Sequence, residues 1–99
     1  MAETNGLDGV LDDLKEQLNI LINEEDKRLE SFLNTAHTTL KAWCGEFGWE
    51  NLRGRQLVFD YVRFMRAGAS EYFYPRFKAE IISFGFSLME VPDEEPEQE

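Results

Sequence analysis

The amino-acid sequence predicts an all-α fold: a small four-helix bundle, then an extended C-terminal segment and an acidic disordered tail. Apolar residues recur at helical spacing in four separate stretches, which indicates amphipathic helices. Capping residues and glycines stand at the ends of these stretches. A chain of 99 residues has room for one domain at most. We therefore expect a flexible leader over residues 1–8, a helical domain over residues 9–85, and an arm with the tail over residues 86–99.

The first helix is expected over residues 9–19. Asp8 precedes it and is a favourable N-cap residue. Its apolar stripe is made of Val10, Leu11, Leu14 and Leu18. Residues 19–22 have the sequence Asn-Ile-Leu-Ile, which breaks the helical period. These four residues therefore predict a short extended link.

Asn23 is the expected N-cap of the second helix, with Asp26 at the third helical position in an arrangement like a capping box. The helix should end before Gly45, since glycine readily adopts the left-handed conformation that terminates helices. Its continuous core face is made of Leu29, Phe32, Leu33, Ala36, Leu40 and Trp43. The connector that follows, residues 46–52, contains two aromatic residues that we expect to fold back on the core.

The third and fourth helices follow this connector. The third is expected over residues 53–67, with Gly68 ending it. The fourth is expected to run to Phe84, beginning at either Ser70 or Pro75. Proline lacks the amide hydrogen that a helix interior uses, so Pro75 either stands in the first turn or marks a kink.

The pattern changes after Gly85. A weak alternation of apolar and polar residues over residues 86–91 predicts an extended arm. The acidic stretch DEEPEQE, residues 93–99, predicts disorder because it offers too little apolar surface to bury. The predicted core consists of Leu14, Leu18, Leu29, Phe32, Leu33, Ala36, Leu40, Trp43, Val58, Tyr61, Val62, Phe77 and Ile81.

The sequence predicts no catalytic site, no metal site and no cofactor. The single cysteine, Cys44, and the single histidine, His37, are seven residues apart, which provides neither a metal cluster nor an oriented nucleophile. The carboxylates lie in hydrophilic runs, whereas acid–base catalysis needs burial to separate two pKa values. There is no apolar run long enough to cross a membrane and no signal peptide, so we expect a protein that is cytosolic or released from the cytosol.

The net charge of −10 is distributed unevenly along the chain. Residues 1–50 carry 4 basic and 11 acidic groups, residues 51–80 carry 6 basic and 3 acidic groups, and residues 81–99 carry 6 acidic groups alone. Such acidity argues against nucleic-acid binding, which needs a dominant basic surface. The asymmetry fits either head-to-tail docking between copies or an ordinary acidic surface that aids solubility.

The chain contains thirteen aromatic residues, and twelve of them lie from Trp43 onward. Four small helices can hide only some of these rings. The five that exceed the predicted core are Tyr72, Phe73, Tyr74, Phe84 and Phe86. They fit either a protein interface or an extended aromatic core.

Several segments together resemble the head–tail connector family of tailed bacteriophages, also called adaptor or head-completion proteins. The resemblance begins with Leu11-Asp12-Asp13-Leu14-Lys15 and continues through Glu25-Asp26-x-x-Leu29 to Trp43-Cys44-Gly45. It resumes at Gln56-Leu57-Val58-x-x-Tyr61-Val62-Arg63 and at Glu71-Tyr72-Phe73-x-x-x-Phe77. It covers roughly residues 9–90, and its specificity comes from the order and spacing of the pieces.

The resemblance implies a structural virion protein, not an enzyme, whose copies form a ring, typically of twelve, under the portal protein. Such a ring extends the DNA channel, lets genomic DNA pass without specific binding, and docks stopper or tail-completion proteins. The implied location is the head–tail interface of the virion, with host cytoplasm during assembly and no membrane contact. The implied portal-binding arm comprises Phe84, Phe86, Leu88, Met89 and Val91. The expected subunit interface comprises Arg55, Arg63, Arg66, Tyr72, Phe73 and Tyr74.

Two other classes of function remain open at this point. A small acidic inhibitor could imitate DNA and bind a host or defence enzyme through electrostatic steering. A DNA mimic needs most of its carboxylates on one exposed face, whereas these acids cluster at helix starts and in the tail. The third possibility is a helical interaction module without a specialised role.

Overall fold

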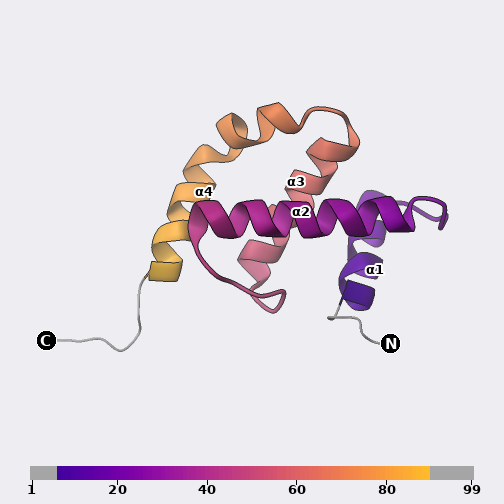
Figure 1. Ribbon diagram of the computed structural model, residues 1–99, viewed down its shortest axis with the longest axis horizontal. Helices are drawn as coiled ribbons and strands as arrows, with labels where there is room; N and C mark the ends of the chain where they lie inside the picture. Colours follow the sequence, from indigo (N-terminus) through magenta and orange to yellow (C-terminus); the bar gives the residue numbers. More distant parts are fainter. Residues whose placement is uncertain (1–6, 90–99) are drawn as a thin grey trace, which may run out of the picture.

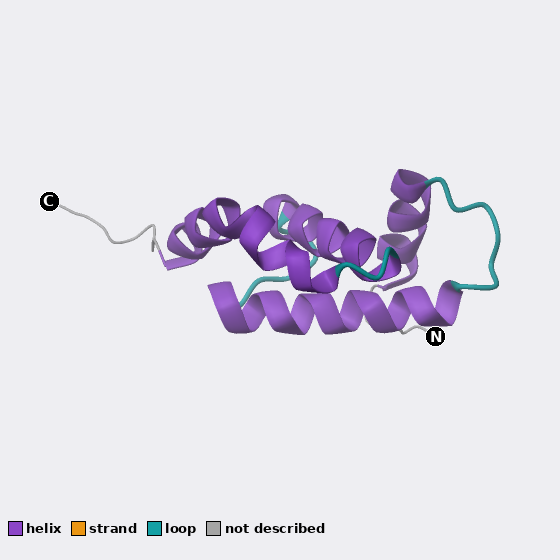
Figure 2. Cartoon of the chain, turned by 90° about the horizontal axis from the view of Figure 1, so that it is seen from above, coloured by secondary structure: helices purple, strands orange, loops and turns teal. Residues whose placement is uncertain are grey.

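The computed structural model describes residues 7–89 and confirms the all-α fold. Four α-helices follow one another, and a single turn of 3₁₀ helix, η1, precedes the last; the elements are α1 (Leu7–Leu18), α2 (Asp26–Cys44), α3 (Leu52–Arg66), η1 (Ser70–Tyr72) and α4 (Phe73–Met89). The longest helix, α2, contacts each of the other three. In Figure 1 α2 runs across the molecule, with α1 towards one end and the last turns of α4 at the other. Figure 2 shows that α1, α3 and α4 all lie on the same side of α2.

The first helix begins two residues earlier than expected and ends in a left-handed residue. Asp8 therefore lies within α1 rather than at its N-cap. At the other end Asn19 has a φ of 61°, and its amide donates to the carbonyl of Glu16 at 3.2 Å. The amide of Ile20 donates to the carbonyl of Lys15 at 2.8 Å. These two bonds form a Schellman motif, so α1 stops at Leu18 and the chain turns into the link.

The expected N-cap of the second helix is wrong. The helix begins at Asp26, after Glu25, and no side chain caps it. The amide oxygen of Asn23 instead accepts a hydrogen bond from Lys15 Nζ at 2.7 Å, and the same ammonium group pairs with Asp26 at 2.7 Å. Lys15 thus bonds to the side chains of both Asn23 and Asp26, the two residues of the expected capping arrangement. These two bonds fix α1 to the start of α2.

The core lies between α2 and the other helices. Of the predicted core residues, these are buried: Leu14, Leu29, Leu33, Ala36, Leu40, Val58, Val62 and Ile81. Partly buried at its edge are Leu18, Phe32, Tyr61 and Phe77. Trp43 requires a correction, because its side chain is 41% exposed. Cys44 takes the core-facing position instead, since a step of four from Leu40 continues the buried face of α2.

The connector between α2 and α3 folds back on the core. Phe47 is buried and its ring packs edge-on against Phe84, with 5.1 Å between the ring centroids. His37 Nε2 forms a 2.8 Å hydrogen bond with the carbonyl of Phe47, and its ring packs against Trp49 at 4.2 Å. The histidine therefore fastens the connector to α2.

Gly54 marks the closest approach of α3 to the connector and to α4. A Cβ at this position would lie 2.5 Å from a ring carbon of Phe47 and 2.7 Å from one of Phe84. Neither ring can move away, since both are buried. The first turn of α3 thus requires glycine, and the side chain of Asn51 caps this turn by accepting a hydrogen bond from the Gly54 amide at 3.1 Å.

Replacing Gly54 with alanine should destabilise the protein although alanine is the better helix former. The overpacking cost of about 1–3 kcal/mol exceeds the gain in helix propensity of about 1 kcal/mol, so we expect the melting temperature to fall by several degrees. Gly9→Ala is the matched control, because a Cβ there meets nothing within 4 Å. That variant should melt at or slightly above the wild-type temperature. A rise in both melting temperatures by thermal circular dichroism would contradict the packing at Gly54.

The last helix differs from both expected starting points and is longer than expected. It begins at Phe73, so Pro75 occupies the third position, where a helix has no use for the missing amide hydrogen. It bends at Phe77, whose φ of −108° and ψ of 15° leave the helical region. It then continues to Met89, which makes the expected extended conformation wrong for residues 86–89. The helical spacing of Phe77, Ile81, Phe84 and Leu88 outweighs the weak alternation there; Val91 and the acidic tail lie outside the described residues.

Candidate functional site

An exposed apolar groove lies between the C-terminal end of α2 and the second half of α4. The residues that line it include Trp43, Tyr74, Ile82, Gly85, Phe86 and Met89, and we call this surface the apolar groove. The side chains of Phe86 and Met89 are 62% and 70% exposed. Apolar surface of this kind on a small soluble protein typically marks a site of interaction with another macromolecule.

The groove exists because the second half of α4 has two apolar faces. One face, which includes Ile81 and Phe84, is buried in the core. The other follows Ile82, Phe86 and Met89 at steps of four and three, and it remains exposed. A helix that is apolar on both faces is normally covered on both. The second face of α4 is therefore the part of the domain that lacks a cover.

A cluster of aromatic rings supports one wall of the groove. Trp43 stacks on Tyr61 with 5.7 Å between centroids and meets Tyr74 edge-on at 4.9 Å. Tyr61 in turn stacks on Phe73 at 4.3 Å, and Phe73 stacks on Phe77 at 4.7 Å. The cluster joins α2, α3 and α4, so the groove wall is already ordered in the single chain.

The same packing affects two titratable groups near the groove. Burial raises the pKa of the Tyr61 hydroxyl and of the Cys44 thiol above their ordinary values. The Cys44 thiol donates a weak hydrogen bond to the carbonyl of Ile81 at 3.5 Å. Both groups are therefore neutral at physiological pH and act as packing residues.

The residues expected at the subunit interface do not form one surface. Tyr72 and Tyr74 are exposed, but Phe73 is fully buried in the aromatic cluster, which corrects its expected role. Arg55 pairs with Asp13 of α1, and Arg63 pairs with Asp60 of its own helix at 3.5 Å. Arg66 donates two hydrogen bonds to the Glu25 carboxylate, at 3.0 and 2.9 Å. The three arginines thus serve contacts within the chain, away from the groove.

The residues expected in the portal-binding arm are also divided by the structure. Phe84 is 1% exposed and belongs to the core, which corrects its assignment to the arm. Leu88 is partly buried against the core. Phe86 and Met89 lie in the apolar groove, as helical residues rather than as parts of an extended arm. Val91 lies outside the described residues.

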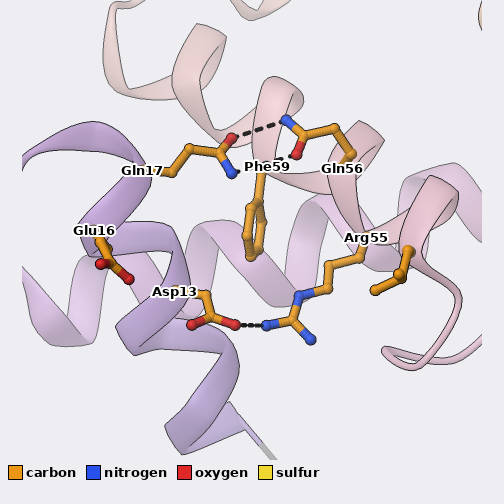
Figure 3. A pocket seen from close by; sticks show the side chains of 7 residues that line it. Asp13, Glu16, Gln17, Arg55, Gln56 and Phe59 are labelled. Atoms are coloured by element: carbon orange, nitrogen blue, oxygen red, sulfur yellow. Dashed lines mark hydrogen bonds and ion pairs between the residues drawn. The ribbon is translucent and has the colours of Figure 1, made fainter.

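A second hollow, between α1 and α3, is polar, and several of the side chains that line it pair with one another. Figure 3 shows Asp13 of α1 facing Arg55 of α3, with the ring of Phe59 between this pair and Gln17. Beside them the amides of Gln17 and Gln56 donate to each other, at 3.3 and 2.8 Å. These groups satisfy one another, so the hollow is the contact that holds α1 to α3 rather than a binding site.

The link between α1 and α2 also carries large apolar side chains that are exposed to solvent. Leu21 and Ile22 are 93% and 52% exposed, and we call these two residues the apolar link. Glu25, which follows them, has a lowered pKa because Arg66 donates hydrogen bonds to its carboxylate. The link is thereby fastened to the end of α3, while its two apolar side chains extend into solvent.

The described part of the chain offers little for other kinds of chemistry. Residues 7–89 contain no group of three side chains that could hold a metal ion. No helix in the same part has the length and hydropathy needed to cross a membrane. Several carboxylates are paired within the chain, those of Asp13, Glu25, Asp26 and Asp60 among them. These acids therefore do not form the unpaired array that a DNA mimic requires.

Comparison with models of known protein families finds a match. A family model described as phage gp6-like head-tail connector protein matches residues 9–88. The matched region includes almost all of α1 and α4 and the whole of α2 and α3. No curated protein and no solved structure matches the chain.

Proposed function

Because this chain belongs to the phage gp6-like head–tail connector family, and so is a structural connector protein of the phage virion, we propose that its copies form a ring under the portal. In this proposal the ring contains twelve copies, the number typical of the family that the sequence resembles. The ring extends the DNA channel and docks stopper or tail-completion proteins. The family match agrees with the resemblance found in the sequence.

The apolar groove is the observation that carries this proposal. A domain of 99 residues buries a limited core, yet this one leaves five large apolar side chains exposed at one end: Trp43, Tyr74, Ile82, Phe86 and Met89. Covering them against another protein removes this apolar surface from water and stabilises the complex. A subunit that works within an assembly needs such a surface, whereas a protein that works alone does not.

We assign the portal contact to the chain beyond Met89. Phe84 is buried and Phe86 and Met89 line the groove, so residues 84–89 offer no free arm. Residues 90–99 contain Val91 and six acidic residues, which can follow a basic surface of the portal through complementary charge.

Genomic DNA passes the ring without specific binding in this proposal. The net charge of −10 gives little opportunity for phosphate contacts, because affinity for duplex DNA comes mainly from cations that release counterions. Acidic groups along the channel would repel the duplex and let it slide.

The test is to mix the purified chain with its portal protein and to follow rings by negative-stain imaging and co-sedimentation. We expect the full chain to form rings that are attached to the portal. The chain truncated after Met89 should still form rings, but these rings should not bind the portal. The truncation point after Met89 leaves the whole of α4 and the apolar groove in place. A variant with residues 90–99 in scrambled order keeps the charge of the tail and changes its sequence, so it separates the effect of charge from that of residue order.

The outcomes separate the parts of the proposal. A truncated chain that binds portal as tightly as the full chain would show that residues 90–99 do not make the contact. A full chain that forms no ring with or without portal would contradict the ring itself.

A further inference from the structure

We propose that the apolar link of one copy docks in the apolar groove of the next copy, so that neighbouring subunits are joined head to tail. This inference rests on the ring proposed above and identifies the two surfaces that make it. The occupant of the groove is therefore a second copy of this chain.

The two surfaces lie at opposite ends of the molecule. The link leads into the first residue of α2, and the groove lies beside its last two residues, Trp43 and Cys44. Nineteen residues of helix separate them, a length of about 28 Å. In Figure 1 the link and the C-terminal half of α4 stand at opposite sides of the view. A link therefore cannot reach the groove of its own chain.

This placement determines the kind of assembly. A contact between two different patches at opposite ends leaves one link and one groove free after every addition of a subunit. Such heterologous contacts close into a ring when the rotation between neighbours allows it. A contact between two identical grooves would stop at a dimer instead.

The sizes of the two surfaces agree. The groove is open to solvent and offers about 320 Å³ of space, whereas an apolar cavity of about 150 Å³ already admits a molecule of benzene. The groove thus has room for the side chains of Leu21 and Ile22 together. Leu21 at 93% exposure is the most exposed large apolar residue of the described chain, so it gains most from a cover.

An exposed acid stands beside the link, and an exposed cation stands beside the groove. Glu24 follows the apolar link and is exposed. Lys78 of α4 stands one helical turn before Ile82; it is exposed and forms no ion pair with any residue in 7–89. Glu80 is the one acidic residue within α4. Docking the link against α4 therefore brings the carboxylate of Glu24 towards the ammonium group of Lys78, which favours this orientation.

Two variants of the full chain test the inference by sedimentation velocity over a wide range of concentration. The link variant carries Leu21→Asp and Ile22→Asp, and the groove variant carries Phe86→Asp and Met89→Asp. All four side chains are more than half exposed, so the fold should persist, and a thermal melt checks this for each variant. Leu52→Asp is the matched control, since Leu52 is 75% exposed on α3 outside both surfaces.

We expect each variant alone to associate at least tenfold more weakly than the wild type and the control to associate normally. An equimolar mixture of the two variants should form a one-to-one dimer and stop there, because each variant keeps one intact surface. A link variant that still forms rings would overturn this inference and leave the ring proposal standing. A groove variant that forms rings but loses the portal would assign the groove to the portal instead, and a wild type that stays monomeric with portal present would overturn both proposals.

Discussion

Replacing Leu33 with aspartate should leave the chain unfolded at 25 °C. Leu33 is fully buried in the middle of α2, the helix that contacts all the others. The described residues place no buried charged or polar side chain in this core, so a carboxylate there would have no partner. Removing a buried leucine costs about 2–5 kcal/mol, and burying an unpaired polar or charged group costs several more. The total approaches or exceeds the 5–15 kcal/mol that stabilises a typical domain.

Circular dichroism at 222 nm measures this result directly, through the loss of helical signal and of a cooperative melt. Leu21→Asp is the control, because it makes the same substitution at a side chain that is 93% exposed. It should melt within a few degrees of the wild type. A cooperative transition near the wild-type temperature for Leu33→Asp would show that this side chain is not in the core.

The helical periodicity that predicts Leu33 also predicts most of the fold, because it depends on local geometry. A step of three or four residues keeps side chains on one face whatever packs against that face. The same rule leaves one ambiguity at the end of α2, where steps of three and four from Leu40 reach Trp43 and Cys44. Size and hydropathy favour the tryptophan, but the space beside Ile81 admits the smaller thiol. Only the packing of α4 decides between them.

Helix ends depend on contacts that the local sequence does not contain. Gly68 ends α3 as expected, since glycine adopts its φ of 71° without strain. Asn23 has the right chemistry for an N-cap, yet Lys15 of the preceding helix occupies its side-chain oxygen. The partner lies eight residues away, and only the turn at Asn19 brings it near.

The candidate site is the part that the sequence predicts least completely. Counting aromatic residues correctly indicates that some rings remain exposed, but it does not identify them. Phe73 and Phe84 are buried because the bend at Phe77 and the folded connector bring them into the core. The apolar link has a signal in the sequence, since Leu21 and Ile22 stand outside the helical period. Its meaning depends on the groove at the far end of the molecule.

Replacing Phe73 with alanine should lower the melting temperature by more than about 12 °C. Phe73 is fully buried, and its ring contacts four others: Trp43, Tyr61, Phe64 and Phe77. Truncating a buried phenylalanine costs about 3–5 kcal/mol, and each kcal/mol corresponds to about 4–8 °C in a domain of this size. The near-ultraviolet circular dichroism should weaken as well, because the stacked rings lose their fixed arrangement.

The neighbouring residue supplies the control, and the groove supplies a second readout. Tyr72 is 61% exposed in η1, so Tyr72→Ala should change stability by less than about 0.5 kcal/mol. Phe73→Leu separates the contribution of buried apolar volume from that of ring stacking, since leucine keeps much of the volume and removes the stacking. Because Trp43 reaches the core through Tyr61 and Phe73, Phe73→Ala should also weaken self-association at temperatures where the variant remains folded. Normal association by a folded Phe73→Ala chain would show that the groove does not depend on the cluster beneath it, and the ordered wall would then have to come from α4 alone.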